Sequence, residues 1–225
     1  MKSKELIETI KKKEGNRPFD ANKLYKEVED KLSELAYYKA LNRFAKEDVL
    51  MRVGKGVYCL SEGKVPTPEE IMAPYIEKKK GMKVGYALYG ELGLTKGEKG
   101  GKELFTNALR GNKKTVQGVK IKKVDLVFDE KTKEHVAILE VLADFSSIED
   151  LDLPAFVRYA EGFAKDYDEA TMKKVLRSIS YKKSTIAFLR DVLDHYGVEN
   201  SLMSYLSPLS IYKFPRMEEL CKEAS

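Results

Sequence analysis

The sequence is poor in the residues that build most metal sites and nucleophilic active sites. It has only two histidines and two cysteines in 225 residues. Cys59 and Cys221 lie far apart and lack the spacing of a zinc-ligand pair, so the simplest interpretation is two free thiols in a cytosolic protein. His135 and His195 belong to no recognisable motif. We therefore expect no metal site.

Long apolar runs are also missing. No run approaches the roughly 20 residues that a helix needs to cross a bilayer. The first residues, MKSKELIETIKKKEG, are charged throughout and lack the apolar core of a signal peptide. These absences predict a cytoplasmic protein with no membrane partner.

The signatures of common enzymes do not occur in the sequence either. There is no dinucleotide-binding fingerprint and no HExxH motif. The loop at 97–102 fails as a phosphate-binding loop because no glycine precedes Gly101 by five positions, and Glu103 replaces the Ser or Thr that would hold magnesium.

Two further active-site patterns are incomplete. A nuclease set of Asp125 or Asp129 with Glu140 would need a lysine where Leu142 stands. The Gly-Ser and paired aspartates of a nucleotidyltransferase are absent. We therefore expect a protein that is not an enzyme, with no catalytic residue and no cofactor.

Charge is distributed unevenly along the chain. Residues 1–64 hold 15 Lys or Arg against 11 Asp or Glu, residues 65–125 hold 13 against 7, and residues 126–225 hold 13 against 18. The net charges are therefore +4, +6 and −5. A basic N-terminal half and an acidic C-terminal half suggest that the N-terminal half binds a polyanion, although charged runs are often just solvated surfaces.

The stretch RVGKGVYCL at 52–60 predicts a two-stranded ribbon. Apolar residues alternate on both sides of it, as in a half-buried strand. The Gly-Lys-Gly connection supplies the positive φ that a tight hairpin needs. The ribbon would carry Lys55 at its tip and Arg52 beside it.

Three helical segments precede this ribbon. The first covers residues 4–13 and ends before Pro18. The second starts near Asp20, a good N-cap residue, and continues through Val28. Ser33 can cap the third, which runs to about Lys46.

The third helix has two distinct faces. Tyr37, Tyr38, Leu41, Phe44 and Ala45 follow the spacing of a buried face. The opposite side forms one polar stripe of hydrogen-bond donors without an acidic residue: Lys39, Asn42, Arg43 and Lys46. Lys and Arg neutralise phosphates, and Arg and Asn can read base edges in a major groove. The same stripe could also be an ordinary solvated face.

The order of these elements is that of a winged helix-turn-helix, in which the third helix enters the major groove and the ribbon contacts the backbone or minor groove. We therefore predict a DNA-binding domain over residues 1–64. Asn42 and Arg43 would contact base edges. The backbone contacts would come from Tyr37, Lys39, Lys46, Arg52 and Lys55.

The remainder, 65–225, is predicted to be a second domain, and the whole protein to be of the α+β class. Thr67 can cap a helix that has Pro68 at its first position, and another helix is expected from Val84 to Leu92. Strands at 103–109, 114–123 and 124–128 would form a small sheet. Its basic turns would offer additional backbone contacts through Arg110, Lys113, Lys114 and Lys122, or would simply aid solubility. Residues 129–225 are predicted to be mostly helical.

Several segments resemble AbiEi-like antitoxins and their relatives among transcriptional regulators. ALNRFAKEDVLMRVGKGVY resembles the segment that closes the winged helix of this family. PTPEEI, GYALYGELGLT and ELFTNALRGNKKTVQGVKIKKV follow in the family's order, and the resemblance extends over about 19–125. Asp48 stands where the family usually has glycine, and Lys55 where arginine is common.

The resemblance implies a transcriptional regulator, often the antitoxin of a type IV toxin–antitoxin pair. Such a protein represses its own promoter and counteracts a nucleotidyltransferase-like toxin in a bacterial cytosol. Two other functions stay open: a protein-interaction antitoxin that neutralises its toxin through the acidic C-terminal half, and a protein that binds RNA. Whether the chain is a monomer or a homodimer is also open.

Overall fold

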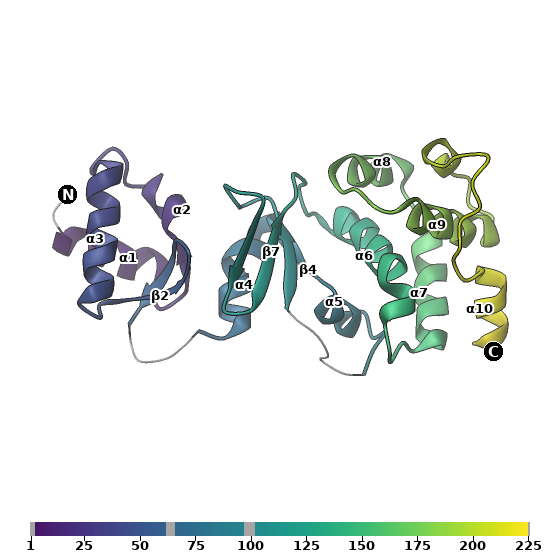
Figure 1. Ribbon diagram of the computed structural model, residues 1–225, viewed down its shortest axis with the longest axis horizontal. Helices are drawn as coiled ribbons and strands as arrows, with labels where there is room; N and C mark the ends of the chain where they lie inside the picture. The colour runs from purple at the N-terminus through teal and green to yellow at the C-terminus, as the bar shows by residue number, and fades with distance from the viewer. Residues whose placement is uncertain (1–2, 62–65, 97–101, 225) are drawn as a thin grey trace.

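The computed structural model describes residues 3–61, 66–96 and 102–224. It is of the α+β class, as predicted, with three parts that follow one another along the long axis of the molecule (Figure 1). The expected domain boundary at 64/65 and most of the glycine-rich loop at 97–102 lie outside the described residues. No helix in the described part of the chain is long and apolar enough to span a membrane.

The N-terminal part contains the three expected helices and the ribbon. Its elements are α1 (Ser3–Glu14), β1 (Phe19–Asp20), α2 (Ala21–Tyr25), α3 (Glu34–Lys46), β2 (Leu50–Gly54) and β3 (Val57–Leu60). The strands form an antiparallel sheet in the order β1-β3-β2. Helix α2 is shorter than predicted because turns follow it, and Ser33 precedes α3 without a side-chain capping bond.

The ribbon is buried on both of its faces, whereas its sequence predicts a half-buried one. Leu50, Tyr58 and Leu60 pack into the core of the N-terminal helices. Val53 and Cys59 instead join a second core, which the ribbon shares with the middle part of the molecule. The alternating pattern predicts one solvent-exposed face of the ribbon, but a neighbouring sheet covers that face.

The two glycines of the ribbon have different functions. Only Gly56 has a positive φ, +66°, as the turn at Lys55–Gly56 requires. Gly54 lies within β2, where an added Cβ would come within 2.9 Å of a Val116 methyl carbon. Gly54 therefore permits the close approach of the ribbon to the second sheet.

The middle part is a four-stranded sheet, with α4 packed on one of its faces. It consists of α4 (Pro68–Ile76), a short 3-10 helix (Glu77–Lys79), β4 (Gly81–Val84), α5 (Tyr86–Glu91), β5 (Glu103–Thr106), β6 (Lys113–Val116) and β7 (Val119–Lys123). The strand order is β4-β5-β7-β6, with β5 and β7 parallel and the other pairs antiparallel. Helix α4 begins as predicted, with a capping box between Thr67 and Glu70.

Several sequence predictions for this part are wrong. The strand predicted at 114–123 is a hairpin, broken by Gln117 and Gly118, which both have positive φ. Val84 ends a strand rather than starting a helix, and residues 124–128 form no strand. Lys113 and Lys114 consequently lie in β6 and Lys122 in β7, not in turns.

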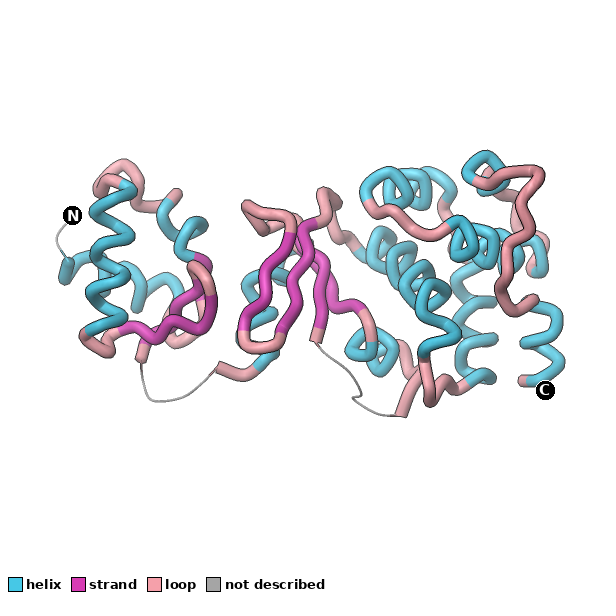
Figure 2. Tube along the Cα trace, viewed as in Figure 1, coloured by secondary structure: helices cyan, strands magenta, loops and turns pink. Residues whose placement is uncertain are grey.

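The sheet separates the two ends of the molecule (Figure 2). Residues on one face, including Leu104, Val116 and Ile121, pack against α4 and the ribbon. On the other face Val84 and Phe105 join the core of the C-terminal helices. The pleat therefore sends alternate residues of the same strands into two different cores.

The C-terminal part is helical, as predicted. It contains α6 (Glu130–Asp144), α7 (Leu153–Lys165), α8 (Glu169–Ser178), α9 (Lys183–His195) and α10 (Met217–Glu223), with short 3-10 helices at Phe145–Ser147 and Leu202–Tyr205. The tail docks on this body, since the Phe214 ring stacks on Phe188 at 5.4 Å and Met217 is buried. Just before these contacts in the chain, Leu209 and Ile211 are 97% and 95% exposed.

Candidate nucleic-acid interface

A groove of about 630 Å³ lies between the N-terminal part and the second sheet. Its walls come from the start of α2, the polar face of α3, the tip of the ribbon and the segment 109–114. The lining residues are Asp20, Asn22, Tyr38, Asn42, Arg52, Lys55, Gly56, Tyr58, Leu109, Arg110, Gly111, Lys113 and Lys114. Predicted contact residues from both basic regions of the sequence thus meet on one surface.

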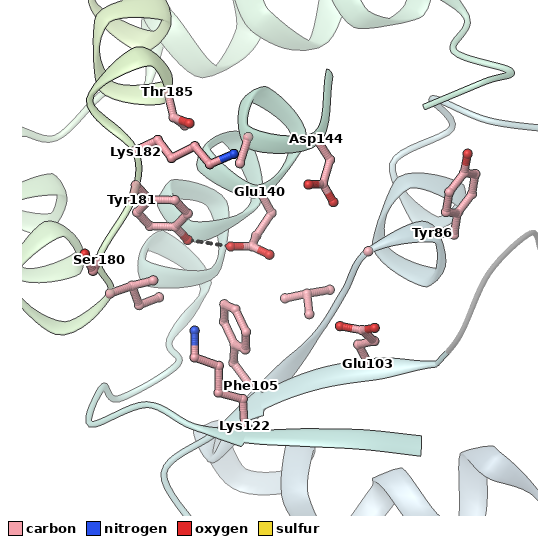
Figure 3. A pocket seen from close by; sticks show the side chains of 14 residues that line it. Tyr86, Glu103, Phe105, Lys122, Glu140, Asp144, Ser180, Tyr181, Lys182 and Thr185 are labelled. Atoms are coloured by element: carbon pink, nitrogen blue, oxygen red, sulfur yellow. Dashed lines mark hydrogen bonds between the residues drawn. The ribbon is translucent and has the colours of Figure 1, made fainter. Parts of the chain in front are cut away.

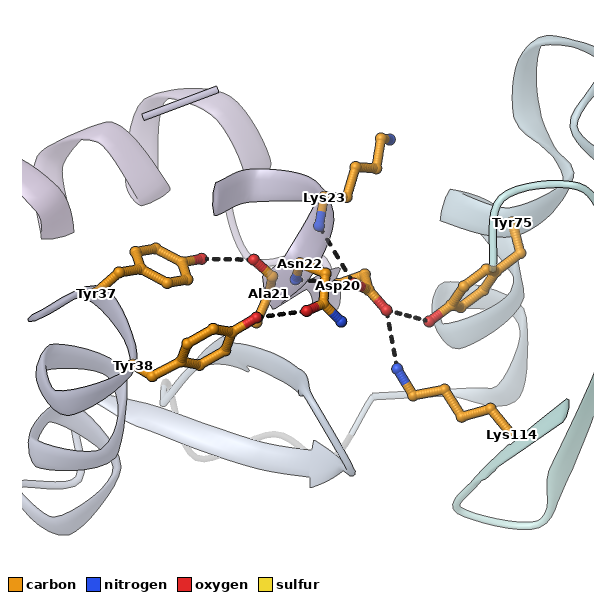
Figure 4. Close-up of polar contacts among 8 residues, drawn as sticks. All are labelled: Asp20, Ala21, Asn22, Lys23, Tyr37, Tyr38, Tyr75 and Lys114. Atoms are coloured by element: carbon orange, nitrogen blue, oxygen red, sulfur yellow. Dashed lines mark hydrogen bonds and ion pairs between the residues drawn. The ribbon is translucent and has the colours of Figure 1, made fainter. Parts of the chain in front are cut away.

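Asp20 holds the two walls of the groove together (Figure 4). One carboxylate oxygen accepts hydrogen bonds from the backbone N–H groups of Asn22 and Lys23, so Asp20 caps α2 as predicted. The other accepts from the Lys114 ammonium at 2.9 Å and from the Tyr75 hydroxyl at 3.5 Å. A single side chain therefore fixes α2 to both β6 and α4.

Four cations that line the groove have no acidic partner among the described residues. Arg52, Lys55, Arg110 and Lys113 are exposed, and none forms an ion pair within residues 3–61, 66–96 and 102–224. Lys114 differs, because Asp20 neutralises it. The groove consequently keeps an excess of positive charge, which attracts polyanions.

The predicted polar stripe of α3 is exposed, but its members face different surroundings. Asn42 lines the groove. Lys39 and Arg43 line a smaller hollow beside Ser3. Arg43 donates a hydrogen bond to the Ser3 hydroxyl and pairs with Glu47 at 3.7 Å. Reading a base would therefore require Arg43 to exchange these surface contacts for new ones.

Tyr37 is a core residue, and its predicted contact with DNA is wrong. Its side chain is 0% exposed, and its hydroxyl donates to the backbone oxygen of Ala21 at 3.0 Å. Burial raises the pKa of this hydroxyl. The sequence prediction missed the next residue, Tyr38, which lines the groove and donates to the Asn22 side chain. Tyr37 and Tyr38 are adjacent at the edge of the apolar stripe, so the sequence pattern does not indicate which of the two side chains faces outward.

Lys122 is not brought into the groove. It lies on the face of the second sheet that points away from the N-terminal part, paired in register with Lys113 and Phe105. Its ammonium sits 5.1 Å from the centroid of the Phe105 ring. Lys122 could meet a nucleic acid only if that partner also passed over the edge strand β6.

The other residues that sequence reasoning considered for chemistry have structural partners. Asp129 caps α6 through the backbone N–H of Thr132, and Asp125 pairs with Lys123. The His135 ring is buried and bonds to the backbone of Lys131 and Asp168. Among the described residues no group of three or more His, Cys, Asp or Glu is arranged to hold a metal.

Comparisons with known proteins add little. No protein-family model matches the chain, and no curated protein is similar to it. Among solved structures, the chain is similar to the crystal structure of RV2827C protein from Mycobacterium tuberculosis, with 10% identity and a TM-score of 0.43. The likeness covers 87% of this chain and 77% of that one. It is too weak to carry an inference about function.

Proposed function

We propose that this protein is a sequence-specific regulator of transcription that binds double-stranded DNA, of the AbiEi-like antitoxin kind. In this proposal residues through 61 form a winged helix and α3 is its recognition helix. The observation that carries the proposal is the groove, in which Asn42 of α3 meets Arg52 and Lys55 of the ribbon and Arg110 and Lys113 of the second sheet.

The charges of the groove favour a phosphate backbone as its partner. Arg52, Lys55 and Arg110 are exposed on this surface, Lys113 borders it on the edge strand β6, and none of the four pairs with a carboxylate in the described part of the chain. The carboxylate of Asp20 is already neutralised by Lys114. A protein that replaces the counterions of DNA with such side chains gains affinity by releasing them. The adjacent α3 offers Asn42 and Arg43, residues that form bidentate pairs with adenine and guanine.

The packing of the ribbon suggests how the two basic regions cooperate. Because the ribbon lies against the second sheet, its tip at Lys55 lies beside Lys113 and Lys114. One duplex could therefore contact α3, the ribbon tip and the segment at Arg110 together. The link through Asp20 would keep these contacts in a fixed relative position.

The test is binding of the purified protein to labelled duplex DNA from upstream of its own gene, measured by fluorescence anisotropy over a salt series. A scrambled duplex of equal length and composition is the control, and duplex RNA of the same sequence is the competitor. The proposal predicts preference for the upstream DNA and steep weakening with salt. Equal affinity for upstream and scrambled DNA would overturn a sequence-specific regulator, and stronger competition by RNA would make RNA the partner.

A second candidate is an antitoxin that acts by binding a protein, such as a nucleotidyltransferase-like toxin. It is favoured by Leu209 and Ile211, two almost fully exposed aliphatic side chains in the acidic C-terminal part. Replacing both with Ser should abolish co-purification with a protein encoded beside it, while the folded state persists. Unchanged co-purification would remove this surface from consideration.

A further inference from the structure

A second cavity, of about 490 Å³, lies between the sheet and the C-terminal helices (Figure 3). Sites for small molecules in proteins usually have volumes of about 300–1,000 Å³. The lining residues are Val84, Gly85, Tyr86, Glu103, Phe105, Lys122, Glu140, Ala143, Asp144, Ile179, Ser180, Tyr181, Lys182 and Thr185. They come from the sheet face that points away from the groove, from α5 and α6, and from the segment that leads into α9.

Glu140 is the most enclosed charged group of this cavity. One of its oxygens accepts a hydrogen bond from the Tyr181 hydroxyl at 2.7 Å, and the other points into the cavity. No cation pairs with Glu140 in the part of the chain that the structure describes. Burial raises the pKa of its carboxyl to about 7, because the charged form loses hydration there.

A second carboxylate lies one helical turn further along α6. Asp144 also lines the cavity, and its Oδ2 accepts from the Tyr89 hydroxyl at 2.8 Å. Like Glu140, it forms no ion pair with a described residue. An ammonium group placed beside these two carboxylates would form the ion pair that no described residue makes with them.

Two lysines line the same cavity and are also without a carboxylate partner. Lys122 and Lys182 are exposed, and neither forms an ion pair within the described ranges. Lys122 is held over the Phe105 ring instead. The cavity is therefore lined by two acidic and two basic side chains that form no ion pairs with one another.

The rest of the wall is apolar or aromatic, with Val84, Phe105 and Ile179 among its residues. Such walls accept a short carbon chain and exclude water around it. We propose that this cavity binds a small zwitterion of the α-amino-acid class. Its ammonium lies at Glu140 and Asp144, its carboxylate at Lys182 on the same side of the cavity, and its side chain against Val84, Phe105 and Ile179.

This inference does not depend on DNA binding, so it is tested without DNA. The L-amino acids are titrated one by one into the full chain by isothermal titration calorimetry at neutral pH. Each that binds is compared with its decarboxylated amine and its deaminated acid; for leucine these are isoamylamine and 4-methylpentanoate. A zwitterion site predicts that removing either charged group weakens binding about 10- to 100-fold.

Two matched pairs of variants locate the site. Glu140→Gln and Lys182→Met should each weaken binding of the same amino acid at least about tenfold, whereas Glu134→Gln on α6 and Lys183→Met on α9, which do not line the cavity, should leave it unchanged. Because Glu140→Gln could alter the fold, its melting curve is recorded, and Lys182→Met at the exposed edge provides an independent result. Lack of binding by every L-amino acid, equal binding of the amine alone, or unchanged affinity in both cavity variants would overturn the proposal.

Discussion

The Asp20 carboxylate lies 2.9 Å from the Lys114 ammonium, across the contact between the N-terminal part and the second sheet. Only 12% of the Asp20 side chain and 13% of the Lys114 side chain are exposed. Removing one partner of such an enclosed ion pair strongly destabilises the folded state, because the remaining charge stays buried without a partner. The pair therefore adds to the apolar core that the ribbon shares with the second sheet in holding the two walls of the groove together.

Asp20→Asn tests this link. Asparagine is as good an N-cap as aspartate, so the change removes the charge while α2 keeps its cap. We expect the free energy of unfolding to fall by about 3 kcal/mol, measured by urea denaturation. The double variant with Lys114→Met should recover part of this loss, because it no longer buries a lone ammonium.

The control is Asp125→Asn, which breaks a pair with Lys123 whose acidic side chain is 80% exposed. Its expected cost is about 0–1 kcal/mol. Equal costs for Asp20→Asn and Asp125→Asn would show that enclosure of the Asp20 pair has no energetic consequence.

The approach of the ribbon to the sheet gives a second prediction. Gly54→Ala places a methyl group within 2.9–3.3 Å of three Val116 carbons and should cost about 1–3 kcal/mol. Adding Val116→Ala should remove most of this extra cost in a double-mutant cycle. Gly56→Ala should also destabilise, through its positive φ, but nothing lies within 4 Å of its added Cβ. Val116→Ala should therefore not reduce the cost of Gly56→Ala. An equal reduction of the cost of both glycine substitutions would contradict a steric cause at Gly54 and a backbone cause at Gly56.

Features that depend on local sequence were predictable here, and features that depend on contact between distant segments were not. Asp20 and Thr67 cap their helices as predicted, because a cap involves only the next few residues. The burial of Val53 and Cys59 on the outer face of the ribbon was not predictable, since it arises from a sheet formed some 50 residues later. The sequence predicts that apolar residues alternate along the ribbon, but not which segments pack on each of its two faces.

The candidate site shows the same limit. The positive charge of both basic regions was visible in the sequence, and so was the exposed side of α3. The turn at Gln117–Gly118 was missed, so Lys113 and Lys114 were not placed on an edge strand. Their meeting with Lys55 in one groove depends on the packing of two sheets, for which the sequence carries no short-range signal.

The second cavity predicts a dependence of stability on pH. Burial raises the pKa of Glu140 from 4.5 to about 7. Between these values the folded state keeps a proton that the unfolded state has released, so the free energy of unfolding falls as the pH rises through this window. Relative to Glu140→Gln, the wild type should lose about 1–3 kcal/mol from below pH 4.5 to above pH 7.

Taking the difference between wild type and Glu140→Gln separates this effect from that of His135. Burial lowers the pKa of His135, which makes the folded state less stable as the pH falls below 6.5 and therefore acts in the opposite direction. Both proteins contain His135, so its contribution cancels. Parallel stability curves for the two proteins would contradict the assignment to Glu140.

The proposed DNA complex predicts different effects for the α3 helix and the ribbon. Asn42→Ala and Arg43→Ala should each cost about 1–3 kcal/mol on the upstream sequence and lower its preference over scrambled DNA. Lys55→Ala should weaken both duplexes alike, because a phosphate contact carries no sequence information. Anisotropy titrations with both duplexes measure this ratio. Equal proportional losses on both duplexes for all three variants would remove base reading from α3.

The central claim is that the groove is where the polyanion binds, and the salt dependence of DNA affinity tests it most directly. The double variant Lys55→Ala with Arg110→Ala removes two charges from the groove, whereas Arg177→Ala with Lys183→Ala removes two exposed charges from the C-terminal helices. Each phosphate contact contributes about 0.9 to the slope of log affinity against log salt. We predict a slope shallower by about 2 for the groove variant and an unchanged slope for the control. Equal slopes in the wild type and both variants would contradict the claim.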